Sequence, residues 1–102
     1  MNESSAANAG RPAVQLRLGQ LVATPAAIEA MARAGQNPAP LLARHRAGDW
    51  GEVDADDAAA NDRAAREGER VLSAFVLKDG SRVWILTEAD RSATTILLPE
   101  DY

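Results

Sequence analysis

Two chemically versatile residue types are almost missing from this chain, which has no cysteine and a single histidine, His45, among its 102 residues. Without cysteine there is no disulfide framework, no thiolate metal site and no thiol nucleophile. With one histidine, a histidine-rich metal site is excluded, and a histidine-based catalytic triad depends on His45 alone. We therefore expect no metal and no cofactor.

Long apolar runs and an excess of basic residues are also missing. No run approaches the ~20 residues that a membrane-spanning helix needs, and no apolar segment near the N-terminus resembles a signal peptide, so a cytoplasmic protein is expected. The formal net charge is −4, with eight acidic residues against two arginines in residues 49–69. A chain of this charge has no bulk attraction for phosphate backbones, so a nucleic-acid partner is not expected.

The composition is that of one small globular domain. Hydrophobic residues make up 46% of the chain, and a chain of 102 residues is long enough to bury a core. Residues 1–12 are small and polar, which predicts a disordered N-terminal tail. Residues 13–102 are expected to form a single domain. Because aromatics are scarce and alanine is frequent, its core should be thin in large side chains.

The first half of this domain reads as one strand followed by three helices. Alternating apolar residues predict a strand over 13–22, and Gly19 interrupts it at a bulge or a close approach. Thr24-Pro25 and Asn37-Pro38 are typical helix starts, which predicts helices over 25–34 and 38–47. Asp54 is placed to cap a third helix over 55–67, rich in alanine.

The last third of the chain reads as β-structure. Strands are predicted over 70–77, 82–87 and 93–98, with a hairpin turn at Asp79-Gly80. Apolar residues on both faces of the first of these predict a central strand. The order β-α-α-α-β-β-β indicates an α+β fold, with an antiparallel three- or four-stranded sheet and helices packed on it. The sequence leaves the partner of the first strand open.

The candidate site is the polar connection at 88–92, since loops at strand ends often carry function. Glu88 and Asp90 have the chemistry of an acid and a base, and Arg91 can hold an anion. The alternative is a solvated turn in which Asp90 accepts backbone N–H bonds. Trp50 lies in another loop, either as an anchor for a partner or as a plug that buries the loop.

Together these residues define a hypothetical binding surface made of Trp50, Glu88, Asp90 and Arg91. On this hypothesis, replacing Asp90 and Arg91 by alanine abolishes partner capture and leaves the melting temperature nearly unchanged. His45 is read in two ways, as part of a phosphate contact with its flanking arginines or as a side chain packed beside Leu41. The second reading is favoured because three basic residues are too few for a nucleic-acid footprint.

Several segments resemble one small bacterial family. They are residues 18–25 (LGQLVATP) and 83–102 (VWILTEADRSATTILLPEDY), together with 44–45, 48–51 and 59–61. Members of this family are often labelled "plasmid-related protein" or "type I restriction endonuclease subunit M". The restriction label does not fit the residues, since 37–40 (NPAP) lacks the aromatic of a methylase signature. The resemblance implies a bacterial, often mobile-element, context and supplies no catalytic residues.

The function expected from these observations is that of a non-catalytic binding or accessory protein with a protein partner. A homodimer through an open sheet edge, such as the final strand, is also considered. One alternative is a toxin-type ribonuclease of the RelE/ParE kind, whose strand-helix-helix-meander layout is similar, using Arg82, Arg91 or His45. The other is a DNA-binding regulator using Arg33, Arg44 and Arg46.

Overall fold

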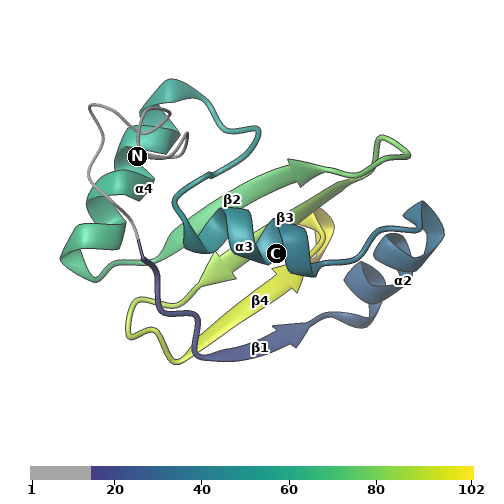
Figure 1. The fold of residues 1–102 in the computed structure, drawn as a ribbon, viewed down its shortest axis with the longest axis horizontal. Helices are drawn as coiled ribbons and strands as arrows, with labels where there is room; N and C mark the ends of the chain where they lie inside the picture. The colour runs from purple at the N-terminus through teal and green to yellow at the C-terminus, as the bar shows by residue number, and fades with distance from the viewer. Residues whose placement is uncertain (1–14) are drawn as a thin grey trace, which may run out of the picture.

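The computed structural model describes residues 15–102, and this part of the chain forms three helices on a four-stranded sheet (Figure 1). The α+β class and the element order are as the sequence predicts. The predicted tail over 1–12 lies outside the described residues. In chain order the elements are β1 (Gln20–Ala23), α2 (Pro25–Ala34), α3 (Ala39–Arg46), α4 (Ala55–Glu67), β2 (Val71–Val76), β3 (Arg82–Thr87), β4 (Ala93–Leu97) and a 3-10 turn, η1 (Pro99–Asp101).

The starts of α2 and α4 follow the capping chemistry that the sequence predicts, whereas α3 begins at Ala39, one residue later than predicted, and its N-cap Pro38 makes no side-chain cap hydrogen bond. The Thr24 hydroxyl accepts a hydrogen bond from Ala27 N at 3.1 Å, and Pro25 occupies the first turn of α2. The Asp54 carboxylate accepts from Asp57 N at 2.8 Å at the start of α4. In each case a side-chain oxygen satisfies a backbone N–H that has no partner inside the helix.

The sheet has the order β1-β4-β3-β2 and is mixed. Strands β2, β3 and β4 are antiparallel neighbours, and β1 adds to β4 in parallel, with Leu21 opposite Thr94 and Ala23 opposite Ile96. The partner that the sequence leaves open for the first strand is therefore β4. The final strand lies inside the sheet between β1 and β3, so the expectation that it forms an open edge is wrong.

The first strand is also shorter than predicted. Strand β1 begins at Gln20, and 15–19 are irregular, while Ala13 and Val14 of the predicted strand lie outside the described residues. Leu16 is buried in this irregular stretch, and its N–H donates to the carbonyl of Arg46 at 3.0 Å rather than to a strand. Alternation of burial therefore occurs here without a β-ladder.

Gly19 marks a close approach, one of the two readings that its position suggested. Its φ is +65°, and a Cβ at this position would overlap the backbone of Arg91 and Ser92. A side chain is therefore excluded both by the backbone conformation and by the neighbouring loop. This contact brings the chain that enters β1 against the 88–92 loop.

Strand β2 is an edge strand, so the predicted central position is wrong. Its edge is covered by other means, since Ala74 N donates to Trp50 O at 3.0 Å and Glu52 N donates to Ala74 O at 2.6 Å. Gly51 lies between them, where a Cβ would overlap the Ala74 carbonyl oxygen. These contacts satisfy backbone groups at the β2 edge, while the side chains of Phe75 and Val71 are buried in the two core clusters.

Helices α2 and α3 cover one face of the sheet (Figure 1). The main core lies between them and the strands; its larger side chains are Met31, Leu41, Phe75, Leu77, Val83, Ile85 and Ile96. Helix α4 lies beside β2, where a second cluster joins Leu16, Trp50, Ala64 and Val71. The opposite sheet face carries Leu72, Trp84 and Val22 in the strand alternation, with the C-terminal η1 against β3.

Candidate functional site

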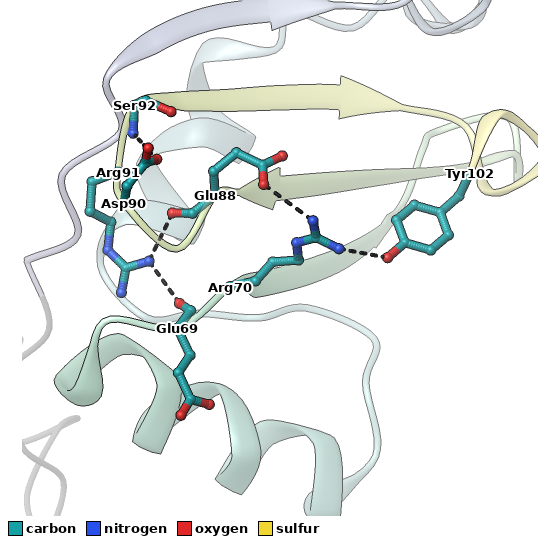
Figure 2. Close-up of polar contacts among 7 residues, drawn as sticks. All are labelled: Glu69, Arg70, Glu88, Asp90, Arg91, Ser92 and Tyr102. Atoms are coloured by element: carbon teal, nitrogen blue, oxygen red, sulfur yellow. Dashed lines mark hydrogen bonds and ion pairs between the residues drawn. The ribbon is translucent and has the colours of Figure 1, made fainter.

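The 88–92 loop is a tight turn held together by its own hydrogen bonds (Figure 2). Glu88 N donates to Ala93 O at 3.0 Å, and the Asp90 carboxylate accepts from Ser92 N at 3.0 Å. Hydrogen bonding from the Ser92 side chain and backbone N–H lowers the pKa of Asp90 below its usual value. Asp90 is thus a turn-forming acceptor, in agreement with the solvated-turn alternative.

Arg91 fastens this loop to helix α4. Its guanidinium donates to the carbonyl oxygens of Glu69 at 2.7 Å, Glu88 at 3.0 Å and Ala64 at 3.1 Å. These carbonyls lie in the loop and around the C-terminal end of α4, where backbone acceptors lack helical partners. The donors that an incoming anion would need are therefore engaged within the protein.

Glu88 belongs to a different cluster, on the sheet face opposite the helices. Its carboxylate lies 3.3 Å from an Arg70 nitrogen, and a second Arg70 nitrogen donates to the Tyr102 hydroxyl at 3.1 Å (Figure 2). The Tyr102 ring meets the Trp84 ring edge-on at 5.6 Å between centroids. No local sequence pattern indicates this cluster, because Arg70 and Tyr102 lie far from Glu88 along the chain and meet it only through the sheet and η1.

Trp50 does not join the loop residues at the surface. Its side chain is only 3% exposed, and its ring nitrogen donates to the Asp62 carboxylate at 2.9 Å. Its ring lies 5.7 Å from the His45 ring in an edge-on contact. The structure thus shows the buried plug. The other three residues of the hypothetical surface lie in the 88–92 loop, but the Glu88 side chain joins Arg70 instead of Asp90 or Arg91.

His45 is completely buried at the centre of a polar network. Its Nδ1 lies 2.6 Å from the Ser73 hydroxyl, and its Nε2 lies 2.8 Å from the Thr87 hydroxyl. Thr87 is in turn 2.7 Å from the Thr94 hydroxyl, which donates to the carbonyl of Leu18 at 2.7 Å. The network therefore links α3, three strands and the segment that leads into β1.

The donor and acceptor roles in this network follow from the Leu18 carbonyl at its end. The Leu18 carbonyl can only accept, so the Thr94 hydroxyl donates to it and accepts from Thr87. Thr87 has then used its one proton, so it accepts from His45 Nε2–H. His45 Nδ1 is left as the acceptor for the Ser73 hydroxyl. Every member is satisfied when the imidazole is neutral.

The surroundings of His45 also favour the neutral ring. Burial, and secondarily the positive charge of Arg91, lower its pKa from 6.5 to about 4. A serine hydroxyl that donates to a histidine is the arrangement of a nucleophile and its base. Here, however, both side chains are fully buried, so no substrate reaches them in this conformation. The network is a structural element of the core.

Other residues considered as functional have partners of their own. Arg33 pairs with Glu29 at 3.0 Å, and Arg44 pairs with Asp49 at 2.7 Å while its guanidinium stacks over Phe75. Arg82 lies at the end of β3 opposite to Thr87, which contacts His45. The arginines proposed for a ribonuclease or a DNA contact do not form one basic patch around His45.

A groove of about 430 Å³ lies on the sheet face opposite α2 and α3. Its apolar lining consists of Leu72, Ala74 and Trp84 from β2 and β3, with Val53 and Pro99. The segment before and at the start of α4 adds three carboxylates to it, those of Glu52, Asp54 and Asp57, and Arg82 adds a positive charge. In this groove, partly buried apolar side chains lie next to exposed charged side chains.

No family model, curated protein or solved structure matches this chain. Within residues 15–102 no helix has both the length and the apolar character required to cross a membrane. The same described part of the chain holds no group of three or more side chains placed to bind a metal ion.

Proposed function

We propose that the protein is a non-catalytic, cytoplasmic binding protein that holds a segment of a protein partner in the groove on the sheet face opposite α2 and α3. The observation that carries this proposal is the groove itself, which has an apolar lining with Trp84 and three carboxylates from residues 52–57. Such a surface suits a segment with one apolar anchor and neighbouring lysine or arginine side chains.

The rest of the chemistry supports binding over catalysis. The one histidine is enclosed in the core, and the guanidinium of Arg91 is used on backbone carbonyls. The family resemblance extends the proposal to an accessory role on a plasmid or an integrated mobile element. Glu88 lies at the rim of this face, where it pairs with Arg70, which also bonds Tyr102. Trp50 and Arg91 instead make contacts that stabilise the fold.

The test is affinity capture of a bacterial protein partner by the tagged full-length chain, after nuclease treatment, with two charge-reversed variants. Asp57→Lys places a positive charge in the groove, and we expect it to weaken capture about tenfold by repelling basic side chains of the partner. Asp56→Lys is the matched control, because Asp56 lies in the same helical turn, is equally exposed and does not line the groove.

Trp84 provides a second readout. It is half-buried in the groove, while Trp50 is buried in the core, so occupation of the groove should shift the emission of Trp84 to shorter wavelength. Equal capture by the two lysine variants, or no captured protein at all, would contradict the proposal. Capture of nucleic acid that disappears with nuclease would instead favour the regulator or the ribonuclease alternative.

A further inference from the structure

The two edge strands of the sheet, β1 and β2, differ in how their outer backbone groups are covered. The β2 edge is covered by residues 50–52 and by the Asn61 side chain, which bonds both Leu72 N and Leu72 O. The β1 edge has no element alongside it among the described residues (Figure 1). It has the sequence Gln-Leu-Val-Ala, without the charge, proline or bulge that usually protects an open edge.

The parallel register fixes which backbone groups of β1 point outward. Gln20 N donates to Ser92 O and Thr24 N donates to Ile96 O, so both face β4. Backbone groups alternate along a strand, so those of Val22 also face β4, whereas those of Leu21 and Ala23 point away from the sheet. The free edge of β1 therefore presents the backbone N–H and C=O groups of Leu21 and Ala23, which are separated by Val22.

Exposed apolar side chains gather at the same edge. Leu21 is 54% exposed, Val22 is 41% exposed, and Ile28 at the start of α2 is 60% exposed. Beside them is a small apolar pocket of about 220 Å³ between β1 and α2. Its lining includes Ala23 of β1 and Ile28 and Met31 of α2.

We propose that β1 pairs antiparallel with β1 of a second copy of this chain, about a two-fold axis at Val22. In this register Leu21 lies opposite Ala23 of the second copy, and the two residues exchange both of their outward hydrogen bonds. The symmetry repeats the exchange between Ala23 and the second Leu21. The two four-stranded sheets then form one continuous sheet.

The β1 edge is complementary to itself, which favours a second copy of this chain as its partner. Leu21 and Ala23 point to the same sheet face, and Ala23 lines the apolar pocket. Leu21 of each copy is therefore placed at the mouth of the other copy's pocket, beside the second Ile28. A self-complementary patch of this kind is what a two-fold interface requires.

The experiment measures the mass of the full-length chain in solution by light scattering over micromolar to millimolar concentrations. The wild type should reach twice the monomer mass. Val22→Lys places two like charges directly opposite one another, and it should stay monomeric at every concentration. Val76→Lys is the matched control, because Val76 is also an exposed strand valine, 43% exposed, on the β2 edge, and it should dimerise as the wild type does.

Cysteine variants test the same pairing by cross-linking, in case the lysine substitution perturbs folding. The chain contains no cysteine, so Val22→Cys introduces one thiol, and the two thiols of the proposed dimer lie within disulfide distance. Oxidation should cross-link Val22→Cys as a dimer far faster than Val76→Cys. A monomeric wild type, a dimer that survives Val22→Lys, or equal cross-linking of the two cysteine variants overturns the proposal.

Discussion

At the scale of single residues, Arg91 shows how one side chain turns a surface loop into part of the scaffold. It is the one non-glycine residue with positive φ, +61°, within residues 15–102. Such a conformation disfavours a side chain, so the surrounding contacts must hold it in place. The three carbonyls that its guanidinium binds supply those contacts and join the 88–92 loop to α4.

Replacing Arg91 should therefore destabilise the fold. Arg91→Ala removes the hydrogen bonds to Glu69, Glu88 and Ala64 but keeps a Cβ at the same backbone conformation. We expect the free energy of unfolding to fall by about 2–3 kcal/mol, the usual range for hydrogen bonds from a charged group. Urea denaturation measures this change.

Asp90→Ala is the comparison, because Asp90 is exposed and bonds only within its own turn. Its effect should stay below about 1 kcal/mol. The sequence-based expectation that replacing both residues leaves stability nearly unchanged therefore conflicts with the observed contacts of Arg91. An equally small loss for the two single variants would show that the carbonyl contacts contribute little.

At the scale of elements, the Asn61 side chain makes hydrogen bonds to the β2 edge that a neighbouring strand would otherwise make. Its side chain is 8% exposed and pairs with the N–H and C=O of Leu72 at 3.2 and 2.8 Å. An amide side chain carries the same donor and acceptor as a peptide group, so it satisfies an edge that no strand covers. With residues 50–52 it closes the β2 edge.

Removing this amide should loosen β2 locally. For Asn61→Ala we expect a loss of about 1–3 kcal/mol in unfolding free energy, because two backbone groups lose their partners. Hydrogen exchange at the Leu72 amide should accelerate by more than exchange in β3. Arg63→Ala, at an exposed position of the same helix, controls for the helix itself. Unchanged exchange at Leu72 in Asn61→Ala would show that the amide does not protect the edge.

The elements also show what could be predicted from the sequence. Thr24-Pro25, Asp54 and Asp79-Gly80 act through local chemistry, so their helices and hairpin were predicted nearly to the residue. The parallel pairing of β1 with β4 depends on contacts across most of the chain, and no local pattern encodes it. The apolar residues on both faces of β2 predict a central strand, but β2 is an edge strand whose outer backbone groups bond to residues 50–52 and Asn61.

The candidate site was predicted only in part for the same reason. The 88–92 loop could be found from its composition, but the partners of its side chains could not. The buried network does have a pattern in the sequence, since Ser73, Thr87 and Thr94 are polar residues at inward positions of their strands. Buried polar residues require hydrogen-bond partners. Ser73 and Thr87 bond to His45, and Thr94 bonds to Thr87 and to the Leu18 carbonyl.

At the scale of the whole molecule, the two faces and the two edges of the sheet are covered to different degrees. Helices α2 and α3 cover one face, and residues 50–52 with Asn61 cover the β2 edge. The opposite face carries the groove with Trp84, and the β1 edge carries Leu21 and Val22. The proposed partner and the proposed second copy use different open surfaces, so one molecule can engage both.

Global stability should depend on pH through His45. The pKa of His45 is 6.5 in the unfolded chain and about 4 in the folded protein. Between these values the unfolded state binds a proton that the folded state does not, so stability falls as the pH drops from 6.5 to about 4. Since one pKa unit corresponds to about 1.4 kcal/mol, the full loss is roughly 3 kcal/mol.

This pH window belongs to His45 and not to the carboxylates. Asp79, Asp90 and Asp101 have pKa values lowered below 3.8 by hydrogen bonding, so the stability they contribute is lost only at more acidic pH. His45→Gln keeps a neutral polar side chain that does not titrate. Although less stable at pH 7, it should show almost no change in urea midpoint between pH 7 and pH 5, whereas the wild type should lose stability. Equal pH responses of the two proteins would mean that the buried network accepts the imidazolium, with Nδ1–H donating to Ser73.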